Sequence, residues 1–305
     1  MKIRVLGSSA GGGFPQWNCN CRNCDGVRRG TLKATPRTQS SIVVSANGED
    51  WLLVNASPDI LAQIAAHPEL QPARRARDSG IAAVLTIDAQ IDHVTGLLML
   101  RERDTPLPLH TTDVVWQDLS SGFPVTSILS HYCGVERHAI PLAGGFSIPA
   151  LSGVDIAALA LSSKAPPYSP HRNAPQPGDN IGLTFTDASS GKRAFYAPGL
   201  GKIEPHVMAA MKDADLLLVD GTCWTNDEMI KLGLSKKTAA DMGHLAQTGP
   251  GGMIEVLDSI NRPSVRKVLI HINNTNPILV EDGPERRLLA EHGIEVACDG
   301  MAFEL

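Results

Sequence analysis

The chain has 305 residues, of which 43% are hydrophobic and 19% charged, and its formal net charge is −5. This balance excludes a disordered chain, and without a basic excess we expect neither nucleic acid nor an anionic membrane surface as a partner. No run approaches the ~18 consecutive apolar residues of a membrane-spanning helix, and the apolar start at residues 1–6 is too short for an export signal. We therefore expect a cytoplasmic protein without membrane insertion.

β-type runs dominate the first part of the chain, and helices are interleaved with strands later. The Asn47-Gly48 pair between two such runs predicts a hairpin turn. Strands are expected near 3–6, 40–46, 51–54, 81–87, 107–110, 138–141, 155–161, 181–186, 193–197, 216–219, 267–271 and 294–297, and helices near 57–66, 93–101, 250–261 and 281–292. The Pro-rich segment 165–178 lies between β runs, which indicates a long loop inside one α/β domain spanning residues 1–305.

Three cysteines are crowded into the segment Cys19-Asn-Cys21-Arg-Asn-Cys24, after a glycine-rich stretch. Three thiolates this close can bind one Zn²⁺ and leave one tetrahedral position for a distant residue. Unrelated thiols and a redox site are the alternatives, and the additional C-x-C spacing favours a metal. Because all-sulfur zinc sites are mostly structural, we expect a structural zinc here.

Potential metal ligands also follow three buried strands. Asp88, Asp92 and His93 come after the strand at 81–87, Asp220 after the run 216–219, and His271 after the run 267–270. Polar side chains at such places are costly unless they are hydrogen-bonded or bind a metal. Taken alone, the first group could equally be a helix N-cap with a turn, but three such strand ends together favour a metal site.

The segment Asp88-x-Gln90-x-Asp92-His93 resembles the H-x-H-x-D-H signature of the metallo-β-lactamase fold family. In this resemblance Asp220 matches the bridging aspartate and His271 the last metal histidine. The cysteine loop is similar to that of a subset which includes a phosphodiesterase of phosphonate metabolism. Stretches 86–98, 197–201 and 271–277 resemble members that work in the synthesis of pyrroloquinoline quinone (PQQ).

The resemblance implies an αββα four-layer sandwich and a role in making PQQ. It also implies that PQQ or a PQQ precursor is the small-molecule partner, with other proteins of that pathway as further partners. In the related phosphodiesterase a histidine lies three residues beyond the last metal histidine. The corresponding residue here is Asn274, which becomes the candidate fourth ligand of the cysteine site.

Two signature histidines are replaced here by Asp88 and Gln90, which favours one metal over the two of a hydrolase. His93 and His271 with Asp92 or Asp220 form a two-histidine, one-carboxylate set, and such a set favours Fe²⁺ and dioxygen chemistry. We expect Asp88, Asp92, His93, Asp220 and His271 around this metal.

Three further side chains are candidates for the reaction itself. His244 lies where related nucleases keep a proton-transfer histidine, so it could be a third ligand or a general acid–base, with Asp92 as the second catalytic residue. Lys164 and Arg172 could hold substrate carboxylates. We therefore expect an iron-dependent hydroxylase acting on a tyrosine-derived (Glu–Tyr) intermediate. A soluble carrier of PQQ without catalysis is the alternative, and a metal-dependent hydrolase is a weaker one.

Overall fold

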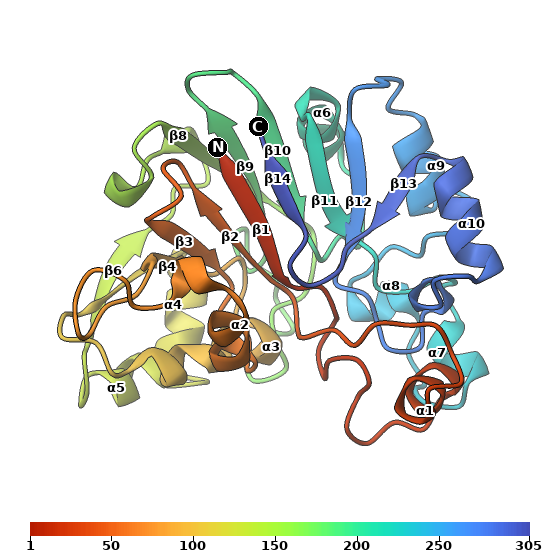
Figure 1. Cartoon of the computed structure of the whole chain (residues 1–305), viewed down its shortest axis with the longest axis horizontal. Helices are drawn as coiled ribbons and strands as arrows, with labels where there is room; N and C mark the ends of the chain where they lie inside the picture. The colour runs from red at the N-terminus through yellow and green to blue at the C-terminus, as the bar shows by residue number, and fades with distance from the viewer.

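Two mixed seven-stranded sheets lie at the centre of the computed structural model, which describes residues 1–305 (Figure 1). The first sheet has the order β14 (Ala302–Glu304), β1 (Lys2–Gly7), β2 (Ser41–Ser45), β3 (Trp51–Val54), β4 (Ile81–Leu85), β5 (Leu107–Thr111) and β6 (Val135–Ala139). The second has the order β13 (Ile294–Val296), β12 (Arg266–Ile270), β11 (Leu216–Asp220), β10 (Arg193–Ala197), β9 (Ile181–Asp187), β8 (Val154–Ala160) and β7 (Gly145–Phe146).

Each sheet is antiparallel in one half and parallel in the other. Strands β3 to β6 are parallel in the first sheet, and β10 to β13 are parallel in the second. Strands in parallel sheets are covered on both faces, which explains why β11 is an unbroken apolar run up to Asp220 and is buried throughout. The carboxyl ends of these strands are the places where the predicted ligands occur.

Helices cover the outer face of each sheet (Figure 1). The first sheet carries α2 (Ile60–Ala66), α3 (Ile91–Val94), α4 (Asp113–Ser120), α5 (Val125–Leu129) and the 3₁₀ helix η2 (Thr95–Leu100). The second carries α6 (Pro205–Asp213), α9 (Met253–Asp258) and α10 (Pro284–Glu291), with α1 (Arg22–Arg29), α7 (Glu228–Lys231) and α8 (Ala239–Met242) on the same side. The remaining 3₁₀ turns are η1 (Pro68–Leu70), η3 (Pro149–Leu151) and η4 (Pro277–Leu279).

Three apolar clusters fill the spaces between these layers. One lies between the sheets and includes Leu52, Leu183 and Leu218, and the other two lie under the two helical layers. Three buried interfaces define four layers, so the predicted αββα four-layer sandwich is confirmed. None of the helices is both long and apolar enough to span a membrane.

Several elements differ from those expected. The helix expected at 93–101 is instead the short α3 followed by η2, and Gly96 lies at the junction. The backbone N–H of Gly96 donates to the carbonyl of Ala56 at 2.9 Å, and not to the carbonyl four residues earlier as in a regular α-helix. A Cβ at this position would come within 2.1 Å of the Ser57 carbonyl oxygen, which explains the glycine. Helices α1, α4 and α6 were not predicted, and each has fewer than ten residues.

Candidate metal centres

Loops from both sheets meet at one edge of the sandwich. Isolated bridges pair Ser9 with Ile272 and Asp88 with Asn180, which ties the loop after β1 to that after β12, and the loop after β4 to the start of β9. A cleft of about 230 Å³ opens there, and its lining includes Asp92, His93, His244 and His271. The structure thus brings together groups that are up to 179 residues apart in sequence.

His93 is oriented by the carboxylate of Asp88. The His93 Nδ1 atom lies 2.8 and 3.0 Å from the two Asp88 oxygens, and the backbone N–H of Gln90 donates to Asp88 Oδ1 at 2.9 Å. The other ring nitrogen, Nε2, is buried and has no hydrogen-bond partner. Its nearest acidic neighbour is Asp92 Oδ2, 3.8 Å away. A histidine bonded to a carboxylate through Nδ1, with a free Nε2, is the usual arrangement of a metal ligand.

His271 points its own Nε2 toward the same carboxylate, with Nε2 3.5 Å from Asp92 Oδ2. Its Nδ1 pairs with the hydroxyl of Thr222 at 2.9 Å. The backbone of His271 is left-handed, with φ 61°, a conformation that costs a residue other than glycine about 1–3 kcal/mol. One ligand atom each from Asp92, His93 and His271 lie within 4.8 Å of one another, which is compatible with a single bound ion.

The charges of this cluster stabilise one another. Burial would raise the pKa of Asp92, but the neighbouring His93 and His271 lower it below the ordinary value. Burial would lower the pKa of His93, but Asp88 and Asp92 raise it to about 9. The arrangement therefore favours a positive charge between the carboxylates, either a proton on the imidazole or a metal ion in its place.

Asp220 and His244 form a second pair next to His271. Asp220 is fully buried and accepts three hydrogen bonds, from the N–H groups of Leu200 and Thr222 and from His244 Nδ1 at 2.8 Å. Burial would raise the pKa of Asp220 and lower that of His244, but their mutual attraction lowers the first pKa and raises the second. The His244 ring stacks on that of His271 with the centroids 5.2 Å apart. The Nε2 atom of His244 is therefore the ring nitrogen that is available for chemistry in the cleft.

Four predicted residues take places different from those expected. Asp88 and Asp220 lie outside the compact ligand set because their oxygens are used to hold His93 and His244. Neither Lys164 nor Arg172 lines the cleft. Lys164 is exposed, and the Arg172 guanidinium donates to the carbonyl of Ala165 within its own loop at 2.5 Å.

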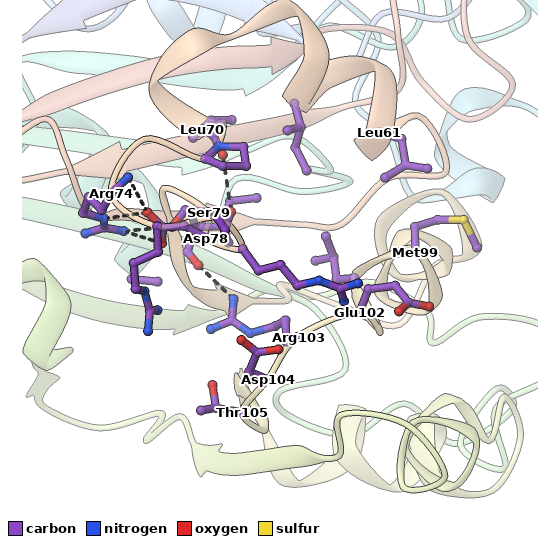
Figure 2. Close-up of a pocket in the computed structure, with 18 residues that line it drawn as sticks. Leu61, Leu70, Arg74, Asp78, Ser79, Met99, Glu102, Arg103, Asp104 and Thr105 are labelled. Atoms are coloured by element: carbon purple, nitrogen blue, oxygen red, sulfur yellow. Dashed lines mark hydrogen bonds and ion pairs between the residues drawn. The ribbon is translucent and has the colours of Figure 1, made fainter.

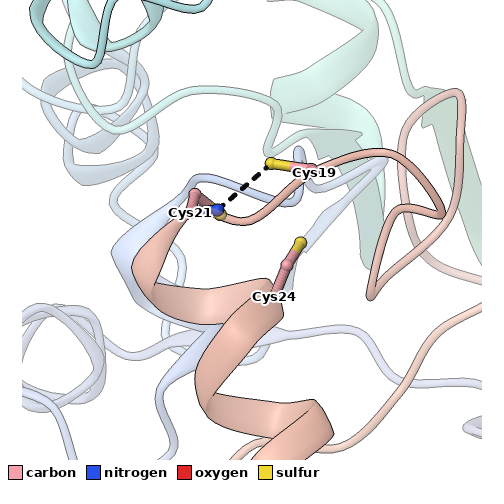
Figure 3. Close-up of side chains that lie close together, drawn as sticks. All are labelled: Cys19, Cys21 and Cys24. Atoms are coloured by element: carbon pink, nitrogen blue, oxygen red, sulfur yellow. Dashed lines mark hydrogen bonds between the residues drawn. The ribbon is translucent and has the colours of Figure 1, made fainter.

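The three cysteines converge at the start of α1 (Figure 3). Their sulfur atoms lie within 4.8 Å of one another, and backbone N–H groups of Gln16 and Cys21 point at the sulfurs of Cys24 and Cys19. Asn274 Nδ2 lies 3.3 Å from Cys24 Sγ, so the predicted fourth residue is at this cluster. Burial raises the pKa of Cys21 to about 11, so a bound cation is needed to keep this thiol deprotonated near neutral pH.

Comparison with known proteins identifies the family. Residues 50–272 match a model described as a beta-lactamase superfamily domain. The coenzyme PQQ synthesis protein B of Cupriavidus necator is 65% identical over 304 residues, which is 99% of each chain. The chain belongs to the coenzyme PQQ synthesis protein B family. The member from Azoarcus sp. is 64% identical over the full length of both chains.

Solved structures agree with this membership. The crystal structure of Zn²⁺-bound PqqB from Methylobacterium extorquens, a protein of the same family, has 37% identity, a TM-score of 0.89 and full coverage of both chains. A diphosphatase of the PhnP family has a TM-score of 0.68 over 100% of this chain and 97% of its own, but only 17% identity. The second likeness shows the shared fold alone.

Three buried polar residues that were not predicted lie close to the cysteine and histidine metal centres. Thr222, Asn276 and Asn23 are at most 4% exposed. Thr222 and Asn23 each make two hydrogen bonds to the 271–276 segment, and Asn276, which belongs to that segment, donates to the Gly221 carbonyl and to Gln247 Oε1. The unusually polar run Asn273-Asn-Thr-Asn276 directly after an apolar strand was the available signal. Buried polar groups of this kind are retained where they are fully hydrogen-bonded.

A second, larger concavity lies elsewhere on the protein. It measures about 650 Å³ and is formed by α2, the 71–80 loop and the end of η2 (Figure 2). Its lining combines apolar side chains such as Leu61 and Met99 with arginines, of which Arg74 is already paired with Asp78. It contains no cluster of metal-ligating groups, so chemistry and not volume points to the smaller cleft.

Proposed function

We propose that this chain takes part in PQQ biosynthesis as a metal-dependent hydroxylase of a tyrosine-derived (Glu–Tyr) precursor. The observation that carries the proposal is the convergence of His93 Nε2, His271 Nε2 and an Asp92 oxygen, with the His93 nitrogen buried and unpartnered. Two imidazoles and one carboxylate with positions left open are the set that favours Fe²⁺. We assign the cysteine site to Zn²⁺ on the basis of its three sulfurs.

The residues present fit one ion at the cleft. An Fe²⁺ ion held by Asp92, His93 and His271 would supply the activation of dioxygen. Asp88 and Thr222 fix the two imidazole rings through Nδ1, so that both Nε2 atoms stay turned toward Asp92. His244, whose Nδ1 is held by Asp220, would take or give a proton at its Nε2 as the phenol ring of the substrate reacts.

The same geometry weighs against a conventional two-metal hydrolase. In that mechanism an aspartate bridges two ions, and Asp220 is the candidate here. Asp220 already accepts three hydrogen bonds, and Gln90 stands where the signature has a histidine ligand. A bridging oxygen would compete with these bonds, above all at Oδ2, which already accepts two of them. We therefore keep hydrolysis as the weaker proposal.

A carrier without catalysis remains the second proposal. PQQ is a tricarboxylate, but no lysine or arginine lines the cleft, so an ion would be its cationic partner there. Binding of PQQ in this cleft would then also depend on the metal ion. The two proposals differ in whether a precursor is changed, and one experiment separates them.

The experiment loads the protein with Fe²⁺ under argon, adds a Glu–Tyr substrate with ascorbate as the two-electron reductant that takes the second oxygen atom to water, and then admits ¹⁸O₂. We expect mass spectrometry to find labelled oxygen on the tyrosine ring, and we expect Asp92→Asn and His271→Ala to lose both iron and product. His292→Ala is the matched control, because His292 pairs with Asp258 at the surface and belongs to neither metal-ligand group. Bound iron without any labelled product would overturn the hydroxylase and favour the carrier.

A further inference from the structure

The cysteine centre and the histidine centre share one short segment of chain. His271 lies at the first position of the segment 271–276, and Asn274, only three residues later, touches the thiols of Cys21 and Cys24. The left-handed backbone of His271 shows that the chain turns sharply between the two centres. A sharply turned segment keeps its shape only when its surroundings hold it.

Asn23 holds that segment from the cysteine side. It lies between Cys21 and Cys24 in the sequence and is 4% exposed. Its side-chain amide donates to the carbonyls of Asn274 at 3.1 Å and Asn276 at 2.9 Å. Any shift of the cysteine loop therefore moves two carbonyls of the segment that begins with His271.

Asn276 continues the connection toward the histidine centre. It is fully buried, and its amide N–H₂ donates to the carbonyl of Gly221 at 3.0 Å and to Gln247 Oε1 at 2.8 Å. Gly221 precedes Thr222, whose hydroxyl pairs with Nδ1 of His271. The chain of contacts thus runs from the thiols through buried amides to the imidazole that faces Asp92.

We propose that Asn23 and Asn276 are positioning residues, and that metal binding at the three cysteines raises the affinity of the Asp92–His93–His271 centre for its own ion. This inference rests on the proposed function of the second centre. A cation at the thiolates fixes the cysteine loop, the loop fixes the 271–276 segment, and the segment fixes His271. By linkage the effect is reciprocal: an ion at the histidine centre raises the affinity of the three cysteines for their own ion.

The test uses Co²⁺ at the histidine centre of zinc-loaded protein, because its visible spectrum reports a nitrogen–oxygen site separately from a thiolate one. For Asn23→Ala we expect about a tenfold weaker Co²⁺ affinity, within the 5- to 150-fold span of typical couplings, while one zinc per chain is retained. Asn18→Ala is the matched control, since Asn18 is exposed in the same loop and only accepts a bond from Gln16. Unchanged affinity in zinc-retaining Asn23→Ala would overturn the coupling.

A second measurement needs no variant, should Asn23→Ala not fold. In the native sequence, the equilibrium affinity of the cysteines for zinc is measured by competition with a zinc-selective chelator, with and without Mn²⁺. We expect severalfold tighter zinc binding when Mn²⁺ occupies the histidine centre, and an unchanged zinc affinity would overturn the proposal. If the native protein binds neither Co²⁺ nor Mn²⁺ at the histidines, the proposed function fails instead, so the two failures are distinguishable.

Discussion

Replacing Asp88 with asparagine tests how the metal ligand His93 is held. In the native protein His93 Nδ1 lies 2.8 Å from Asp88 Oδ1. The substitution keeps the shape of the side chain and an oxygen that can still accept this hydrogen bond, but it removes the negative charge. Hydrogen bonds to charged groups contribute about 1.5–3 kcal/mol and are roughly twice as strong as neutral ones, so about 0.8–1.5 kcal/mol should be lost. Since 1.4 kcal/mol corresponds to a factor of ten, we expect about a tenfold loss of metal affinity.

Isothermal titration with Co²⁺ measures this loss directly. Asp88→Ala leaves Nδ1 without any partner, and we expect it to reach the upper end of the effect of such supporting groups, about 100-fold. Asp258→Asn is the control, because Asp258 accepts from His292 Nδ1 at 2.7 Å at the surface and no metal ligand is involved. Native affinity in Asp88→Asn would refute the orienting role, and a loss as large as that of His93→Ala would make Asp88 a ligand in its own right.

Three further predictions concern other parts of the protein. His244→Gln should bind metal as the native chain does but slow turnover by about 10²–10⁴-fold, measured as kcat beside a metal titration; a parallel loss of metal would make it a ligand. Cys24→Ser should lower zinc content and Tm, whereas Cys133→Ser, which alters an isolated thiol, should change neither in elemental analysis and thermal melting. Burial and the stacked His138 lower the pKa of His110 from 6.5 to about 4. The neutral imidazole of His110 therefore makes its full contribution to the free energy of unfolding above pH 6.5. That contribution is lost as the pH falls toward 4, and the free energy of unfolding decreases by up to roughly 3 kcal/mol. His110→Gln should flatten that part of the pH profile in urea unfolding, and a profile parallel to the native one would contradict this.

Much of the fold was accessible from the sequence because buried parallel strands are continuous apolar runs. The runs at 81–87 and 216–219 could be recognised in this way, and the structure has β4 at Ile81–Leu85 and β11 at Leu216–Asp220. Helices α1, α4 and α6 could not, because each is short and its stability comes from packing on a sheet that the sequence does not display. The expected 93–101 helix is broken where the N–H of Gly96 bonds to the carbonyl of Ala56, a contact that is also invisible in local sequence.

The sequence allowed a prediction of which residues meet at the candidate site, but not of the role of each residue. Asp92, His93 and His271 follow apolar strands, and strand ends converge at one edge, so their proximity could be expected. Tertiary hydrogen bonds determine whether a carboxylate can bind a metal or instead accepts from Nδ1 of a histidine. Asp88 and Asp220 are held in the second way, by His93 and His244. Residues on the 165–178 loop have no periodicity that predicts where they point.

Anomalous diffraction at the iron edge, from crystals loaded with Fe²⁺ under argon, tests the central claim most directly. The account predicts a single iron peak within bonding distance of His93 Nε2, His271 Nε2 and an Asp92 oxygen, with zinc at the cysteines in the same crystals. Two metal peaks bridged by Asp220, or an iron peak that does not contact His93 and His271, would contradict it.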